Sequence, residues 1–216
     1  MMIGPEAFYE YNLKGKNVEE TKKIIRSLKR RINELKLSIE KERFYPKEIY
    51  ISPSDDVQLW CNRLYLDRAM LYLESLGTKY EYSPKEKRCI EFNENIEKLS
   101  KITFEIGGFF HGFDVYEFEF TDNTVHKKIK EVFNDEISFD FEDKDSFINQ
   151  LREMHIGEWK NYYDPSRFGV HILDGTQWSV KFEFSNGAKT VEKSGSNDYP
   201  YNFEKLLEIF GIDNEK

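Results

Sequence analysis

Histidine followed by an acid three positions later is the first pattern here that could do chemistry. The three pairs are His111–Asp114, His155–Glu158 and His171–Asp174. On a helix such a pair shares one face and can bind a metal or exchange protons. The surrounding sequence instead predicts a turn, a helix end and extended chain at the three positions. A hydrolase that uses these histidines with neighbouring carboxylates is therefore the alternative prediction, and its catalytic residues stay unknown.

Other signatures of catalysis or cofactor binding are missing from the sequence. The two cysteines, Cys61 and Cys89, form no CxxC pair, so neither a disulfide framework nor a zinc knuckle is predicted. The glycine-rich GGFFHGF, residues 107–113, lacks the lysine of a phosphate-binding loop and does not open a βαβ unit. No metal or cofactor is expected. The same stretch could be an apolar docking tip or could fold back over a sheet, and both readings stay open.

The stretch KSGSNDYPYNFEKLLEIFG, residues 193–211, places turn-forming residues directly before an amphipathic helix. Asn197 and Asp198 favour a turn, Pro200 suits a first helical turn, and Asn202 is a candidate N-cap. Turn formation explains every residue type, and ligand contact is the alternative. If the protein binds a ligand here, the predicted site is Trp159, Tyr162, Tyr163, Asp174, Trp178, Asn197 and Tyr199.

Two elements of this region also carry a resemblance. DG-x-x-W spans Asp174, Gly175 and Trp178, and GSN-x-YP-x-NF begins at Gly195 and ends at Phe203. Over roughly residues 100–211 the chain resembles bacterial domains of unknown function from Firmicute-like genomes. The resemblance implies a bacterial, cytoplasmic origin and carries no activity.

Composition sets the broad class. The chain has 216 residues, of which 39% are hydrophobic and 33% charged, enough for one core or for a core with a smaller satellite unit. Its net charge of −8 argues against general nucleic-acid binding. No run approaches the ~18 apolar residues of a membrane span. The Met-Met-Ile-Gly-Pro start lacks the pattern of a signal peptide, so a cytoplasmic protein without a membrane partner is predicted.

Residues 1–78 predict a helical hairpin whose first helix is basic. Residues 17–43 hold nine Lys or Arg and five Glu, a local charge of +4, behind a capping pair of Asn17 and Glu20. Apolar residues at heptad spacing predict packing against a second helix, 53–76, capped by Ser52 with Pro53 first. A protein partner, or self-association through the N-terminal helix, is the partner prediction.

Residues 79–216 predict an α+β domain: an antiparallel sheet with helices packed on one face. Weak strand signals are YEY (80–82) and CIEF (89–92). Strong ones are the hairpin around GGFFHGF, EISFDF (136–141), and QWSVKFEF (177–184) with its Asn-Gly turn. Helices are expected at 123–133, 144–155 and 201–210. Since no catalytic pattern stands out, a non-enzymatic binding or protein-interaction module is the leading prediction.

Overall fold

A computed structural model describes residues 2–48, 52–108, 110 and 112–212. The chain divides into two compact units, Met1–Tyr82 and Ser83–Lys216. None of the helices in these described ranges is long and apolar enough to cross a membrane.

The first unit is helical. It contains α1 (Pro5–Phe8), a π-helical turn (Tyr9–Leu13), α2 (Val18–Glu42) and α3 (Asp55–Ser75). The predicted capping box is present: the Asn17 side chain accepts from the Glu20 amide, and the Glu20 carboxylate accepts from the Asn17 amide. The predicted start of the second helix is wrong, because α3 begins at Asp55. Its end is confirmed, since Gly77 has the left-handed φ of +77° that suits a residue after a helix.

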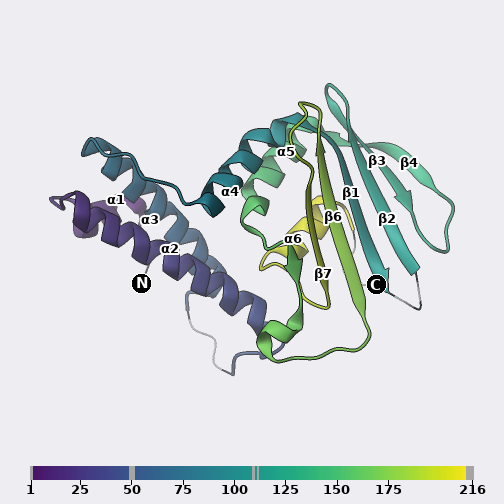
Figure 1. Ribbon diagram of the computed structural model, residues 1–216, viewed down its shortest axis with the longest axis horizontal. Coiled ribbons are helices and arrows are strands. Elements are labelled where there is room, and N and C mark those ends of the chain that lie inside the picture. The colour runs from purple at the N-terminus through teal and green to yellow at the C-terminus, as the bar shows by residue number, and fades with distance from the viewer. Residues whose placement is uncertain (1, 49–51, 109, 111, 213–216) are drawn as a thin grey trace. The chain divides into compact units, whose positions relative to one another are not determined.

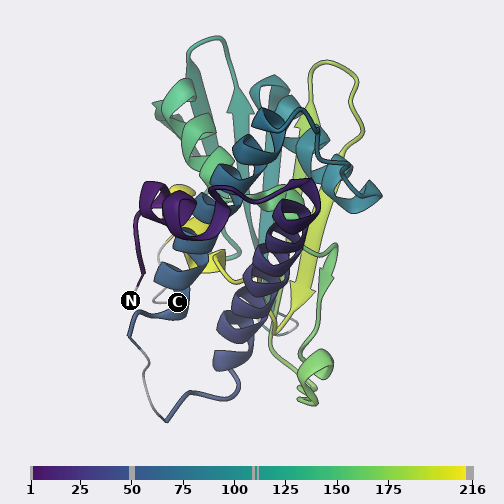
Figure 2. The same ribbon diagram turned by 90° about the vertical axis from the view of Figure 1, so that its left-hand side faces the viewer.

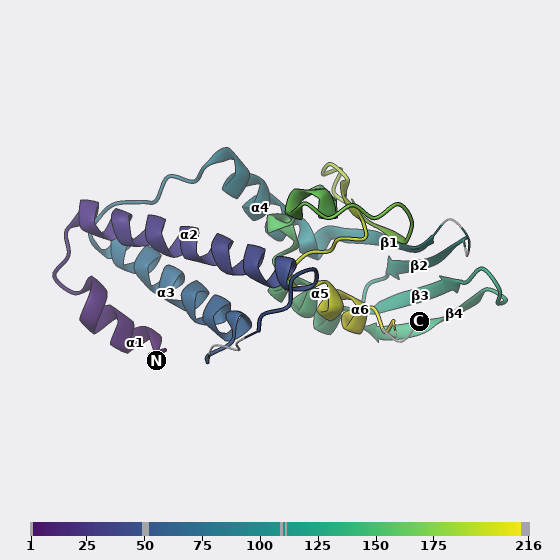
Figure 3. The same cartoon turned by 90° about the horizontal axis from the view of Figure 1, so that it is seen from below.

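The apolar seam of α2 is buried within this unit. Ile25 and Leu28 pack with Tyr65, Ala69 and Leu73 of α3. The two helices run side by side (Figures 2 and 3). The predicted packing of the heptad-spaced seam against the helix that follows is therefore confirmed.

The second unit is the predicted α+β fold. Its helices are α4 (Pro84–Asn95), η2 (Ile96–Lys98), α5 (Lys144–Glu153), η3 (Ile156–Glu158), η4 (Pro165–Phe168) and α6 (Phe203–Ile209). Its strands are β1 (Leu99–Gly108), β2 (Gly112–Phe120), β3 (Thr124–Lys130), β4 (Ile137–Asp143), β5 (Tyr162–Tyr163), β6 (Thr176–Phe184) and β7 (Val191–Ser196). They form one sheet in the order β4-β3-β2-β1-β6-β7-β5 (Figure 1), antiparallel except where β5 joins β7.

One face of the sheet makes the core of this unit. Ile102 and Phe104 of β1 are fully buried, and α5 and α6 supply the apolar side chains that cover them. The ring of Phe118 on β2 lies 4.5 Å, centroid to centroid, from that of Phe210 at the end of α6. Alternation along each strand therefore sends one set of residues into this core and the other set to the opposite face.

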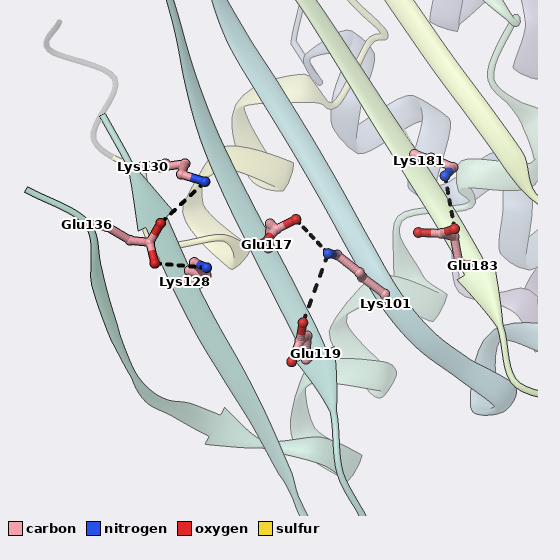
Figure 4. Close-up of polar contacts among 8 residues, drawn as sticks. All are labelled: Lys101, Glu117, Glu119, Lys128, Lys130, Glu136, Lys181 and Glu183. Carbon is pink, nitrogen blue, oxygen red and sulfur yellow. Dashed lines mark hydrogen bonds and ion pairs between the residues drawn. The ribbon is translucent and has the colours of Figure 1, made fainter. Parts of the chain in front are cut away.

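The opposite face carries charged side chains in alternating signs (Figure 4). Lys101 of β1 bridges two carboxylates of β2, with its Nζ 2.5 Å from Glu117 and 4.0 Å from Glu119. Glu136 accepts from Lys128 at 2.8 Å and lies 3.3 Å from Lys130. This pattern is that of an antiparallel sheet with one solvated face.

Three secondary-structure predictions are wrong for residues of this region. A helix was predicted at 123–133, but Thr124–Lys130 form strand β3. The inward position between Val125 and Ile129 holds a buried lysine, Lys127, which hides the period-2 pattern. CIEF lies in α4, which a capping box of Ser83 and Glu86 begins. YEY forms no strand.

Candidate functional site

Three of the predicted binding aromatics lie inside the second unit. Trp159, Tyr163 and Trp178 are 2–3% exposed. Trp178 lies edge-on to Trp159 with the ring centroids 6.3 Å apart, and Tyr199, which is half-buried, stacks on Trp178 at the same separation. Tyr162 alone of the predicted aromatics is well exposed, on the edge strand β5. The aromatic members of the predicted site therefore meet, but mostly as core.

The two sequence elements DG-x-x-W and GSN-x-YP-x-NF are joined by hydrogen bonds. Asn197, with a left-handed φ of 54°, donates its amide N–H to the Thr176 carbonyl at 2.8 Å. Its side-chain oxygen accepts from the Thr176 amide at 2.9 Å. A Cβ at Gly175 would overlap that same oxygen, so glycine is required there. Asp174 and Asn197 are thereby held at the surface where β6 begins and β7 ends.

The expected turn between β7 and α6 forms, with one correction to its capping. Helix α6 begins at Phe203, and the Asn202 side chain makes no cap hydrogen bond. The Asn202 Oδ1 instead accepts from Trp159 Nε1 at 3.0 Å, while its Nδ2 donates to the Met154 carbonyl at 2.8 Å. Asn202 therefore ties the chain before α6 to the end of α5.

A surface pocket of about 360 Å³ lies at the same end of the sheet. Its lining is Phe110, Ile172, Leu173, Asp174, Gly175, Gln177, Ser196 and Asn197. Two of the predicted site residues, Asp174 and Asn197, are among these. Polar groups of Gln177, Ser196 and Asn197 sit beside apolar side chains from two loops, a mixture that ligand-binding surfaces commonly show.

Close backbone approaches join the neighbouring loops into one surface. A Cβ at Gly108, the end of β1, would lie 2.8 Å from the Gly175 carbonyl. A Cβ at Gly112, the start of β2, would lie 2.8 Å from the side chain of Val132. The end of β1 therefore approaches the loop before β6, and the start of β2 approaches the β3–β4 turn.

These three loops expose large apolar side chains, which we call the loop-end surface: Phe110, Val132, Phe133, Ile172 and Leu173. Leu173 is fully exposed, Phe133 is 82% exposed and Phe110 is 76% exposed. A burial-driven fold does not leave such side chains at three adjoining loop tips without cause, and exposed apolar clusters mark interaction sites.

The loop-end surface is also acidic. The stretches 130–136 and 172–177 hold four carboxylates, Glu131, Asp135, Glu136 and Asp174, and one cation, Lys130. Asp174 uses one oxygen to accept from the Gly175 amide at 2.7 Å. Its other oxygen has no hydrogen-bond partner within the described part of the chain.

The histidines of the alternative prediction belong to separate segments. His155 precedes η3 with a left-handed φ of 50°, and His171 is exposed in the loop before β6. His111 lies outside the described residues. Within the ranges that the structure describes, no group of three or more His, Cys, Asp and Glu side chains is placed to hold a metal ion.

Sequence reasoning missed two buried polar groups of this unit. Arg167 and Asp198 form an ion pair in which Asp198 is fully buried. Lys193, also buried, donates to the Trp159 carbonyl at 3.0 Å and to Asn161 Oδ1 at 2.9 Å. Desolvation lowers the Lys193 pKa, partly opposed by the nearby Cys89 thiol. The partners in these contacts lie 31 to 34 positions apart in the sequence, so no local pattern could predict the contacts.

No protein-family model matches the chain, and no curated protein or solved structure is detectably similar to it.

Proposed function

We propose that this protein is a non-enzymatic interaction module that binds a partner protein through the loop-end surface. The observation that carries the proposal is the exposure of Phe110 and Leu173 at one pocket, with the exposed Phe133 on the adjoining β3–β4 turn. A buried apolar anchor supplies most of the binding energy of a protein interface. Glycines at close approaches brace these loops, which reduces the ordering cost of binding.

The charge of this end favours a protein over a lipid surface. Anionic headgroups would be repelled by the net negative charge of these loops, because their four carboxylates outnumber Lys130 and the neighbouring Lys128, which both pair with Glu136. A protein segment that carries apolar side chains next to Lys or Arg matches both features. The apolar side chain of such a segment would contact the loop-end surface, and its cation would reach the Asp174 oxygen that accepts no hydrogen bond within the described residues. Such complementarity sets specificity and the association rate.

Panning a phage-displayed library of random peptides on the immobilised full chain tests this proposal. We expect enrichment of peptides in which an apolar residue neighbours Lys or Arg. The double variant Phe110→Ser, Leu173→Ser should lose that enrichment. Leu37→Ser is the matched control, because Leu37 is an exposed leucine of α2 in the other unit and should leave panning unchanged.

Two outcomes would overturn the proposal. Peptides that bind wild type and the double variant equally would place recognition elsewhere. If the wild-type protein co-sedimented with phosphatidylserine vesicles and the double variant did not, the loop-end surface would be a membrane contact instead. Far-UV circular dichroism of each variant checks that the fold is kept.

The hydrolase alternative gains no support from the described geometry, since His155 and His171 lie on different segments. The two cysteines are free thiols rather than a disulfide. Free thiols suit the reducing cytoplasm that we propose as the location of the module.

A further inference from the structure

Helix α3 has two apolar faces. One packs within the first unit through Tyr65, Ala69 and Leu73, which are 6% exposed or less. The other carries Val57, Trp60 and Leu71, which are 46%, 62% and 60% exposed. An apolar helix face of this length normally has a partner.

The second face is a regular seam. Val57, Trp60 and Leu64 are followed by Asp67 and Leu71, in steps of three, four, three and four residues. These steps align side chains along one line of a helix, as in the a and d positions of a coiled coil. We call these five positions the α3 seam. Asp67 is its single charged member.

We propose that the α3 seam joins two copies of this chain, with α3 packed antiparallel against α3 of the second copy. A two-fold axis between Leu64 and Asp67 sets Trp60 opposite Leu71 of the second copy on both sides of the axis. Beyond these pairs, at the two ends, Val57 lies opposite Glu74. Such a surface is self-complementary, as the contact of a two-fold dimer must be.

The lone acid selects the antiparallel arrangement. In a parallel pair in register, Asp67 would face Asp67 of the second copy, and two like charges in an apolar seam repel. The antiparallel pair sets Asp67 beside Leu64 instead. Desolvation raises the pKa of Asp67 above its ordinary value, and the charge of Arg63, one turn earlier on the same helix, only partly opposes this shift. Single polar residues in such seams specify orientation.

Helix α2 does not compete for this role. Its own seam is used inside the unit, where Ile25 is fully buried and Leu35 is 1% exposed. We therefore propose α3, in place of the basic first helix, as the self-association surface. This inference is independent of the loop-end surface, which lies in the other unit.

Sedimentation equilibrium of the full chain tests the dimer. The seam is short, so the interface is small, and the protein should be followed from about 1 µM to about 1 mM. We expect a reversible monomer–dimer equilibrium. Trp60→Glu and Leu71→Glu should each weaken it at least about tenfold, because both remove an apolar anchor. Leu37→Glu is the matched control, an exposed leucine of α2 outside the seam.

Asp67→Asn gives a second readout. It removes the charge while keeping the size of the side chain, so the dimer should tighten. A chain that stays monomeric over the whole range would overturn the inference, as would equal weakening by Leu37→Glu. A Trp60→Glu variant that melts earlier without changing association would show the seam packed within its own chain, which also overturns it. Phe110→Ser, Leu173→Ser should leave the dimer intact, so the two proposals fail separately.

Discussion

Arg167 binds the carboxylate of Asp198 through two hydrogen bonds, from Nε at 2.5 Å and from Nη2 at 2.9 Å. Asp198 is fully buried and also accepts from the Tyr199 amide at 2.9 Å. Its own carbonyl accepts from Trp178 Nε1 at the same distance. The ion pair therefore fixes the turn that carries Asn197 beside the pocket.

Arg167→Met should destabilise the second unit strongly. Removing one partner of a buried ion pair leaves an uncompensated charge and costs about 3–5 kcal/mol. Urea unfolding followed by tryptophan fluorescence measures the loss. Arg152→Met is the control, because Arg152 pairs with the exposed Glu97, and exposed pairs contribute only about 0–1 kcal/mol. Equal losses in the two variants would contradict a structural role for the buried pair.

Local patterns predicted the elements that local interactions decide. The capping pair Asn17 and Glu20 is present, and so is the helix predicted from residue 144, which Asp143 caps. Strands β6 and β7 form the predicted hairpin, but their pairing stops at Phe182 and Val191, and only Gly187 of the Asn-Gly turn has a positive φ. Strand β3 was missed because its inward lysine is stabilised by residues 83 and 84 positions away in the chain. A window of a dozen residues cannot contain such a partner.

Gly195→Ala should lower the stability of the same unit through packing alone. A Cβ there would lie 2.5 Å from Trp178 Nε1 and 2.6 Å from the Asp198 carbonyl oxygen, both held by the fold. Such overpacking costs about 1–3 kcal/mol. Thermal unfolding measures it, together with loss of Trp178 protection from acrylamide quenching.

Gly187→Ala is the companion variant. Gly187 has φ +78° and open space around its Cα, so alanine there meets only backbone strain of about 1–2 kcal/mol. Its tryptophan quenching should match wild type. If Gly195→Ala left quenching unchanged, the close approach of the indole would be disproved.

Lys127→Met should loosen the end of α6. The buried Nζ donates to the carbonyls of Phe210 at 2.6 Å and Gly211 at 3.1 Å, and lies 4.8 Å from the ring centroid of Phe141. A cation at a helix C-terminus satisfies carbonyls that have no partner in the helix. We expect a loss of about 1–3 kcal/mol and faster amide exchange in α6.

The adjacent Lys128 is the matched control for that variant. It points to the solvated face and pairs with Glu136 (Figure 4). Lys128→Met should therefore leave both stability and exchange in α6 unchanged. Faster exchange in both variants would mean that the strand, and not the buried cation, supports the helix.

For the candidate site, the sequence predicted the turn residues but not which side chains surround them. Asp174 and Asn197 line the pocket, since turn chemistry is local. Trp159 and Trp178 were predicted at a surface and are buried, because aromatic residues serve cores and interfaces alike and only the fold separates the two uses. The adjoining positions of Phe110, Phe133 and Leu173 depend on strand order, which no local pattern reveals.

Lys193 should make stability depend on pH in a direction set by its burial. Its folded-state pKa lies below the ordinary 10.5 because desolvation disfavours the charged form. Between the lowered value and 10.5 the unfolded state binds more protons, so the free energy of unfolding rises with pH through that window. Lys193→Met removes this rise. It also leaves the Trp159 carbonyl and Asn161 without their donor, a loss of about 1–3 kcal/mol at neutral pH.

Urea unfolding of wild type and Lys193→Met from pH 7 to about pH 10 measures both effects. The stability difference between the two proteins should widen as the pH rises. Lys181→Met is the control, since Lys181 is exposed and pairs with Glu183 at 2.9 Å on the solvated face, and its difference from wild type should not widen. A difference for Lys193→Met that stays flat or narrows would show that the buried amine carries no desolvation penalty. In that case the two hydrogen bonds of the Lys193 amine would offset the whole free-energy cost of moving its charge out of water.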